Sequence, residues 1–256
     1  MPDRNGAGAP SLLGGVLTGV TSVLFVHAHP DDETITTGAL LSDLVARGVR
    51  VWLLTATRGE RGEVVSGPLS ALAGTTALAA ERERELQCAT AALGVTERFW
   101  LGDRPARALH RTPRRYRDSG MVWLRTGLAG PAADAADDAL AVAPLAEVTD
   151  DVVALVERLR PELVVSYGVG GGYGHPDHVR AHDAALAASR RVGTPFAEIV
   201  DERAPDADWY PLEEHLPTVT AALRCHASQL SVDGAVIVHS GGQREPIRTS
   251  VGLRRL

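Results

Sequence analysis

Unbroken apolar runs alternate along the chain with stretches in which apolar residues recur every three or four positions. The runs predict buried strands, and the recurring positions predict helices. Several of these helices end at a glycine, the residue type favoured just after a helix. The predicted strands span 22–30, 49–57, 98–102 and 162–168. The predicted helices span 34–48, 73–94, 147–161, 175–193 and 216–230.

The order of these elements predicts the fold class. Continuous apolar strands are typical of a parallel sheet covered by helices on both faces, and sites in such folds lie beyond the carboxyl ends of the strands. We therefore expect an α/β fold, a single-domain, Rossmann-like, mostly parallel sheet with its active site at the C-terminal strand ends. Residues 1–20 are expected to be a flexible N-terminal segment and 21–256 the domain. Loops are predicted over 103–120, 129–144 and 194–215.

Composition narrows the classes of function. The chain has 256 residues and a net charge of −6, which disfavours a general nucleic-acid-binding surface. It contains no run of about 18 apolar residues, so no membrane span is expected, and glycines interrupt the apolar stretch near its start, so no secretory signal is expected. All 26 basic residues are arginine, which GC-rich codon usage explains. Cys88 and Cys225 have no zinc-like spacing and imply no disulfide framework, so a reducing cytoplasm is the expected location.

Two polar motifs lie at the ends of predicted strands and lead into predicted helices, "HAHPDDE" at 27–33 and "GVGGGYGHPDH" at 168–178. Because the carboxyl ends of parallel strands share one edge of the sheet, the fold brings these motifs together. A catalytic divalent metal needs about three protein ligands, and His29, Asp32 and His178 supply two imidazoles and a carboxylate. This set fits zinc, and it also fits iron(II).

Side chains next to these ligands could complete a hydrolytic site. Asp31 lies beside a ligand and is a candidate base for the attacking water. His175 precedes His178 by three residues, on the same side of a helix start, and could stabilise charge on a carbonyl oxygen. Asp177 could orient a histidine ligand.

Each motif also has a simpler interpretation. Acids at 31–33 are favoured at a helix start by capping and by the helix dipole, and an isolated "HPDH" is often a surface turn. The occurrence of both motifs at strand ends favours the metal site. "GVGGGYG" suggests a dinucleotide site, but Tyr173 occupies the third glycine position of G-x-G-x-x-G. The arginines of 103–120 could clamp a phosphate or form a solvated lid.

The chain resembles the PIG-L/LmbE-like family of zinc-dependent N-acetylglucosamine deacetylases. The resemblance rests on "AHPDDE" at 28–33, "TRGERGE" at 57–63 and "GGYGHPDHV" at 171–179. Weaker support comes from "RERE" at 82–85, "YRDSGM" at 116–121 and "CHASQ" at 225–229. Within the family, "RDSGM" and "GGYGHPDHV" are most similar to the mycothiol-pathway deacetylases that act on N-acetylglucosaminyl-inositol.

The resemblance implies that the two histidines and the carboxylate named above are zinc ligands, and it implies roles for four neighbours. Asp31 matches the general base. His175 matches the residue that stabilises the oxyanion and protonates the leaving amine. Asp177 matches a supporting acid, and Tyr173 matches a mobile residue that assists the tetrahedral intermediate.

The resemblance also implies contacts with the substrate. Glu63, Arg82 and Asp118 match positions that hold hydroxyl groups of the sugar or cyclitol. Residues 194–215 form a shorter segment than the mycothiol-pathway enzymes have, so the pocket wall beside the group attached to glucosamine is expected to differ. His226 lies in a family-like patch and is a candidate supporting residue.

The expected function is metal-dependent removal of the acetyl group from an N-acetylglucosamine conjugate, with N-acetylglucosaminyl-inositol as the leading substrate. The alternatives are an amidase acting on a thiol conjugate, malate-linked glucosamine or an antibiotic sugar, a hydrolase of peptides or phosphoesters, and a non-catalytic sugar- or nucleotide-binding module. Zn²⁺ is the expected cofactor, with Fe²⁺ as the alternative. The expected partner is a small amino-sugar conjugate rather than nucleic acid or membrane, and a homo-oligomer is compatible with the sequence.

Overall fold

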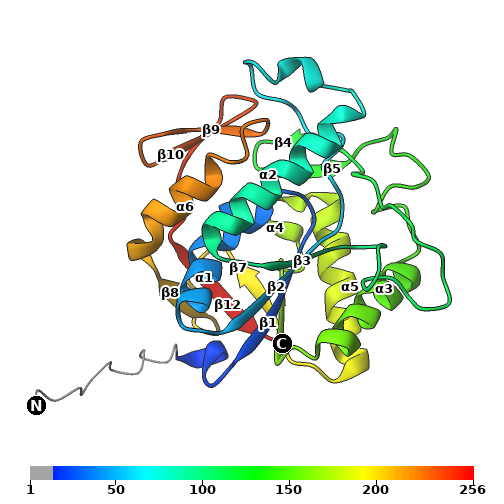
Figure 1. Cartoon of the computed structure of the whole chain (residues 1–256), viewed down its shortest axis with the longest axis vertical. Coiled ribbons are helices and arrows are strands. Elements are labelled where there is room, and N and C mark those ends of the chain that lie inside the picture. Colours follow the sequence, from blue (N-terminus) through cyan, green and yellow to red (C-terminus); the bar gives the residue numbers. More distant parts are fainter. Residues whose placement is uncertain (1–13) are drawn as a thin grey trace, which may run out of the picture.

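The computed structural model describes residues 14–256, and Figure 1 shows the arrangement of its elements. Most of the predicted flexible segment, residues 1–13, lies outside the described residues. Its remainder packs against the domain, because Val16 and Leu17 are buried in a short 3-10 helix, η1 (Gly15–Leu17). The backbone N–H of Val16 donates to Asp208 at 2.6 Å.

A seven-stranded sheet forms the centre of the molecule, in the order β3-β2-β1-β6-β7-β12-β8. The first five strands of this order are parallel, and β12 runs antiparallel to both of its neighbours. The prediction of a mostly parallel sheet is therefore confirmed. The strands are β1 (Ser22–His27), β2 (Arg50–Thr55), β3 (Glu97–Trp100), β6 (Leu163–Ser166), β7 (Phe196–Val200), β8 (Asp208–Pro211) and β12 (Ser250–Arg255).

Helices cover both faces of this sheet, as predicted (Figure 1). One face packs its alternate strand residues, such as Phe25 and Leu53, against three helices in one apolar cluster. The other face packs Leu24 and Leu54 against two helices in a second cluster. The helices on the first face are α1 (Asp32–Ala46), α2 (Ala77–Leu93) and α6 (Leu216–Leu223), and those on the second are α3 (Leu145–Leu159) and α5 (Pro176–Val192).

The position of β1 between β2 and β6 determines where the polar motifs meet. The three strands are parallel, so the residues that follow each of them emerge at the same edge of the sheet. "HAHPDDE" begins with the last residue of β1 and leads into α1. "GVGGGYGHPDH" follows β6 and contains the one-turn helix α4 (Gly171–Gly174) before α5 begins.

Two smaller β elements stand beside this edge. A hairpin of β4 (Met121–Arg125) and β5 (Leu128–Pro131) occupies part of the segment between β3 and α3. An antiparallel sheet follows α6 and consists of β9 (Leu230–Asp233), β10 (Val236–His239) and β11 (Arg244–Pro246). The sequence patterns predicted none of these strands, because each is short and part-exposed and carries no long apolar run.

Two of the three loop predictions are wrong, because these ranges contain strands. Residues 194–215 contain β7 and β8, and residues 129–144 begin inside β5. β7 has only five residues, and β8 is an edge strand with four residues that ends at Pro211. Edge strands tolerate proline, so Pro211 is compatible with pairing on one side only.

The last predicted helix is also shorter than expected. It was predicted over 216–230, but α6 ends at Leu223. Beyond it, the backbone N–H and hydroxyl of Ser228 donate to Glu85 of α2 at 2.6 and 2.8 Å. This backbone donor is therefore taken by a carboxylate on another helix, and the segment turns inward instead of continuing the α-helix.

Cys88 of α2 and Cys225, just after α6, form a disulfide, with their Cα atoms 5.6 Å apart. The expectation that the two cysteines imply no disulfide is therefore wrong. They lie 137 residues apart in sequence, and no spacing rule could have paired them.

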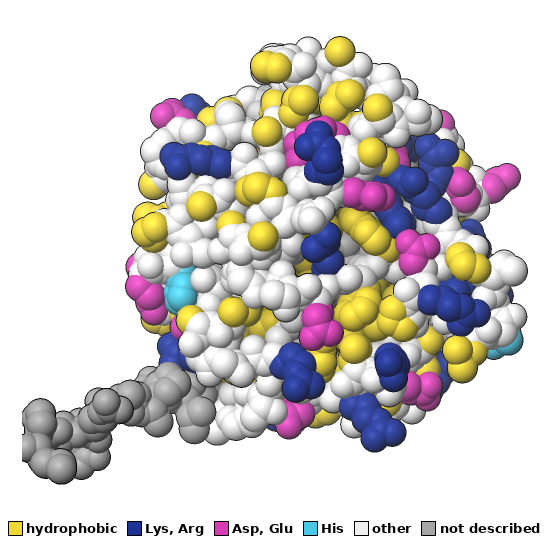
Figure 2. Space-filling view, in the orientation of Figure 1, with side chains coloured by type: hydrophobic (Ala, Val, Ile, Leu, Met, Phe, Trp, Pro, Cys, Tyr) yellow, Lys and Arg dark blue, Asp and Glu magenta, His cyan; other side chains and the backbone are white. Residues whose placement is uncertain are grey.

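The surface carries both signs of charge. On the face shown in Figure 2, arginine side chains lie among acidic ones. Among the described residues, no helix is both long and apolar enough to cross a membrane.

Candidate active site

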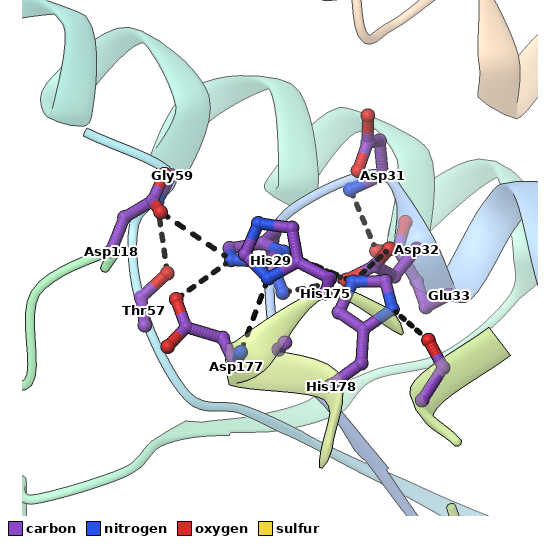
Figure 3. Close-up of polar contacts among 12 residues, drawn as sticks. His29, Asp31, Asp32, Glu33, Thr57, Gly59, Asp118, His175, Asp177 and His178 are labelled. Carbon is purple, nitrogen blue, oxygen red and sulfur yellow. Dashed lines mark hydrogen bonds and ion pairs between the residues drawn. The ribbon is translucent and has the colours of Figure 1, made fainter. Parts of the chain in front are cut away.

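A cavity of about 970 Å³ opens at the edge of the sheet where the polar motifs meet. Its lining includes residues from both motifs, from the β4–β5 hairpin and from the β9–β11 sheet. Figure 3 shows the polar side chains that gather there. The prediction that the fold brings the two motifs together is therefore confirmed.

His29, Asp32 and His178 place three potential ligand atoms close together. His29 Nδ1 lies 3.3 Å from Asp32 Oδ2, and His178 Nε2 lies 3.3 Å from both His29 Nδ1 and Asp32 Oδ1. All three residues are buried. A four-coordinate ion bound at about 2.0–2.1 Å places neighbouring ligand atoms roughly 3.4 Å apart. The spacing and the chemistry of this donor set therefore fit a divalent metal ion.

The outer nitrogen of each histidine is occupied by a protein acceptor. His29 Nε2 donates to Asp177 at 3.2 Å, and His178 Nδ1 donates to the carbonyl of Gly171 at 3.2 Å. A neutral imidazole that donates from one nitrogen leaves a lone pair on the other. With a metal ion bound, both lone pairs would lie on the nitrogens that face Asp32, which is the tautomer required of a metal ligand. Without the ion, burial opposes a charge on His29, but Asp118, Asp177 and Asp32 raise the pKa of its ring well above the usual range.

The glycine at position 171 is needed for the contact with His178. It has a φ of +60°, and a Cβ there would lie 2.9 Å from the Cβ of His178. The close approach of this loop to the site, rather than nucleotide binding, explains the glycine-rich segment.

Tyr167 completes the support of Asp32, a role that no sequence motif indicates. Its hydroxyl donates to Asp32 Oδ2 at 2.7 Å and accepts from the backbone N–H of Ala28 at 2.8 Å. Its ring stacks on His178, with centroids 4.2 Å apart. Burial opposes the charge of Asp32, but His178 and His29 hold the pKa of its carboxyl well below its usual range. The one available signal was a tyrosine directly after a buried strand.

Asp31 lines the cavity beside these ligand atoms, in an unusual backbone conformation. Its φ is +105°, in the region that residues other than glycine rarely adopt. The conformation is held because its backbone N–H donates to Glu33 at 3.0 Å and its carbonyl accepts from Ile35 at 2.9 Å. Burial and the neighbouring charge of Asp32 raise the pKa of the Asp31 carboxyl to about 7.

Glu33 and His226 form a completely buried ion pair behind Asp31, with Glu33 Oε1 and His226 Nε2 3.1 Å apart. The other oxygen of Glu33 accepts the backbone N–H of Asp31. His226 therefore supports Asp31 through Glu33. His226 was a predicted supporting residue. Glu33 was expected only to be an acid at the helix start, so its role in the site is a new finding.

Replacing His226 by alanine is expected to lower the free energy of unfolding by about 3–5 kcal/mol near pH 6, because Glu33 keeps a buried charge without its partner. Urea unfolding of both proteins measures the difference. His239→Ala is a matched control, because His239 pairs with Glu245 at 2.8 Å on the surface. Exposed pairs contribute at most about 1 kcal/mol. Equal losses in the two variants would contradict the assignment of a buried pair.

The same pair predicts how the stability of the unmodified protein varies with pH. Burial opposes both charges, but Glu33 raises the pKa of His226 and His226 lowers the pKa of Glu33. The histidine contribution is fully present below its unfolded pKa of about 6.5 and is lost as the pH rises through the higher folded value. The glutamate contribution is lost as the pH falls below about 4.3. We therefore expect the unfolding free energy, measured from pH 5 to 9, to decrease above pH 6.5. The His226→Ala protein should lack this decrease.

The rings of His175 and Tyr173 pack against the histidine ligand candidates. His175 is buried, and its ring lies 4.6 Å from that of His29 and 4.9 Å from that of His178, centroid to centroid. Burial and these two histidines lower the pKa of His175 to about 3, so its ring is neutral. The ring of Tyr173 lies 5.2 Å from that of His178 and is 38% exposed, in the cavity.

The three predicted substrate residues all line the cavity, but their side chains differ in what they already contact. Asp118 accepts backbone N–H groups of Arg61 and Gly120, and one oxygen lies 3.7 Å from His29 Nε2. The guanidinium of Arg82 donates to the carbonyls of Gly59 and Glu63. Arg82 therefore holds the loop at 59–63 in place.

Glu63 is the most exposed of the three and reaches toward the β9–β11 sheet. Its carboxylate accepts the hydroxyl of Ser240 at 3.0 Å. This contact joins the 59–63 loop to the turn after β10, so both segments contribute to one wall.

Three of the six arginines in 103–120 donate hydrogen bonds to acidic side chains outside that segment. Arg107 donates to Glu147 and Asp151 of α3 at 2.9 and 2.7 Å, and Arg114 donates to Glu147 at 2.9 Å. Arg115 donates to Glu60 at 2.9 Å. These arginines fasten the segment to the domain.

The chain is similar in sequence to known de-N-acetylases. A family model described as PIG-L, GlcNAc-PI de-N-acetylase, matches residues 24–189. A 1D-myo-inositol 2-acetamido-2-deoxy-alpha-D-glucopyranoside deacetylase of Saccharopolyspora erythraea is 37% identical over 251 residues, covering 84% of this chain and 80% of the relative. A protein of the same description from Actinosynnema mirum is 36% identical over 271 residues, covering 90% of each. Another, from Kineococcus radiotolerans, is 48% identical over 166 residues, 65% of this chain and 44% of the relative.

Solved structures share the fold at lower identity. A teicoplanin deacetylase in its zinc-inhibited form has a TM-score of 0.59 and 22% identity, with 82% of this chain and 85% of that chain covered. N,N'-diacetylchitobiose deacetylase from Pyrococcus horikoshii has a TM-score of 0.57 and 21% identity, with 81% and 70% covered. The likeness to these structures concerns the fold alone.

Proposed function

Because the chain belongs to the PIG-L family of de-N-acetylases, we propose that it hydrolyses the acetamide of an N-acetylglucosamine conjugate. The observation that carries the proposal is the placement of the His29, Asp32 and His178 ligand atoms, 3.3 Å apart, in one cavity with Asp31 and His175. A binding module would have no need of buried, ionised groups beside a candidate base.

His29, Asp32 and His178 would hold the metal ion. We propose Zn²⁺, and the same ligands also suit Fe²⁺. When bound, the ion polarises the amide carbonyl and makes a nearby water more acidic. Asp177 and Tyr167 keep the ligands in the required orientation.

Asp31 acts as the general base. Its carboxyl has a pKa raised to about 7, so it accepts a proton more readily than an ordinary aspartate while about half of the molecules keep it ionised at neutral pH. It removes a proton as the water oxygen attacks the amide carbon. The C–N bond then breaks, and the products are acetate and the free amine.

His175 stabilises the negative charge that develops on the carbonyl oxygen. Its Nδ1 accepts the backbone N–H of Asp177 at 3.1 Å, so the neutral ring carries its proton on Nε2 and can donate there. The resemblance assigns protonation of the leaving amine to His175 as well. Asp31 is a second candidate source of that proton, because it holds the one removed from water. Tyr173, whose ring centroid lies 6.1 Å from that of His175, is a second donor for the oxyanion.

For the substrate we propose N-acetylglucosaminyl-inositol, which is named in the descriptions of the relatives. Asp118 and Glu63 offer carboxylates to the hydroxyl groups of such a conjugate, and Arg82 holds the loop that presents Glu63. Sites with hydrogen-bonding groups of this kind discriminate strongly against analogues that leave those groups unpaired.

The test is kcat/KM for N-acetylglucosaminyl-inositol, malate-linked N-acetylglucosamine and free N-acetylglucosamine on one zinc-loaded preparation. The inositol conjugate is expected to exceed the free sugar by at least about tenfold, because remote binding energy appears in kcat/KM. An acetylated peptide and a phosphoester serve as controls for the other hydrolase classes and should not be cleaved. Equal values for the three sugars would overturn the inositol assignment, and activity on none of them would overturn the deacetylase.

A further inference from the structure

The β4–β5 hairpin presents an apolar surface at the mouth of the cavity. Three consecutive residues of β4, Val122, Trp123 and Leu124, are 46%, 52% and 64% exposed. Successive residues of a strand point to opposite faces, and a strand exposed on one side alternates apolar with polar residues. Here apolar side chains occupy both faces, and Trp123 is among the residues that line the cavity. An exposed apolar surface that borders a binding cavity indicates contact with a ligand.

Trp123 and Tyr173 form one continuous aromatic surface. Their ring centroids lie 5.6 Å apart at an interplanar angle of 33°, and both line the cavity. Tyr173 in turn lies 5.2 Å from His178. Two ring-to-ring steps therefore connect the candidate metal ligands to the indole at the mouth.

The hairpin is attached firmly to the groups that orient the ligands. Ser119, two residues before β4, donates its backbone N–H to Asp177 at 2.9 Å, and its hydroxyl donates to the same carboxylate. Asp177 holds His29. On the β5 side, a Cβ on Gly174 would lie 2.9 Å from the carbonyl of Ala129, so the hairpin packs directly against the loop that carries Tyr173. The indole is thus placed at a defined distance from the reacting centre.

We propose that Trp123 is a specificity-determining residue that binds the second ring of the conjugate, the group attached to the N-acetylglucosamine. This inference rests on the proposed deacetylase function. With the acetamide at the candidate metal ligands, the glucosamine ring lies along Tyr173, and the attached ring reaches the indole one step further out. A six-membered polyol ring has an apolar C–H face, which packs on an aromatic face while its hydroxyl groups remain free to bind polar residues.

The test compares two substrates in three variants. Trp123→Ala is expected to lower kcat/KM for N-acetylglucosaminyl-inositol by roughly tenfold and to change that for free N-acetylglucosamine by less than about twofold. Trp123→Phe keeps an aromatic face and should retain most of the activity on the conjugate. Leu124→Ala is the matched control, because Leu124 is exposed on the same strand but is not among the residues that line the cavity. Equal losses on both substrates, or no loss on either, would overturn the role of Trp123.

A binding measurement separates failure of this inference from failure of the proposed function. Calorimetric titration with the amine product, glucosaminyl-inositol, requires no turnover. A roughly tenfold weaker affinity of Trp123→Ala for this product, with unchanged affinity for glucosamine, supports the subsite even in a preparation that hydrolyses neither substrate. Unchanged affinity for both ligands overturns it whatever the activity.

Discussion

Replacing His178 by alanine is expected to remove the bound metal and to lower kcat/KM for the acetylated conjugate by a thousandfold or more. The imidazole Nε2 lies 3.3 Å from both of the other ligand atoms, so its loss leaves two of the three protein ligands. Metal ions contribute several kcal/mol to the stabilisation of developing charge, and about 1.4 kcal/mol corresponds to a factor of ten in rate. Metal content per chain and kcat/KM, measured on the same preparation, are the two readouts.

The control for this prediction is His110→Ala. His110 is exposed in the segment after β3, and no role in the site is assigned to it. It should keep about one metal ion per chain and the rate of the unmodified protein. Thermal unfolding with and without added zinc distinguishes metal loss from misfolding, because a ligand stabilises only a protein that binds it in the folded state. A His178→Ala protein with full metal content would show that the ligand set is wrong.

The positions of the metal-ligand candidates could be predicted because they depend on local features. Each polar motif directly follows an apolar run, and parallel strands place such residues at one edge of the sheet. His29 and Asp32 share one turn, and His178 lies in the first turn of α5. The fold class was predictable for the same reason, since strand and helix alternate with clear periods in the first two thirds of the chain.

The groups that support the site could not be predicted in the same way, because each depends on a contact between distant segments. His226 and Glu33 are 193 residues apart, and Tyr167 and Asp32 are 135 residues apart. Sequence patterns report which face of an element is buried, but they do not report which polar side chains meet across the core. The misread arginines have the same cause. Their composition suggested a charged loop, but Arg107 and Arg114 pair with acids of α3.

Asp31→Asn is expected to retain the metal and to lose roughly 10²–10⁴ in kcat, the usual contribution of a general acid–base group. Asparagine has nearly the same shape, and it is one of the few residues that tolerate a positive φ, so the backbone conformation at +105° should persist. The hydrogen bond from the backbone N–H of residue 31 to Glu33 is also kept. The change therefore removes the basic oxygen and little else. The measurement is kcat together with metal content.

Asp201→Asn is the matched control, because Asp201 lines the same cavity and pairs with Arg248 at 3.0 Å, away from the ligand atoms. It should stay within a few-fold of the unmodified kcat. A near-normal kcat for Asp31→Asn would require another base, and Glu33 is the neighbouring carboxylate. Glu33 is completely buried, and its two oxygens already contact His226 and the backbone of Asp31, so it has no oxygen free for a water molecule. If Asp31→Asn loses activity and keeps its metal, this one substitution therefore identifies Asp31 as the base.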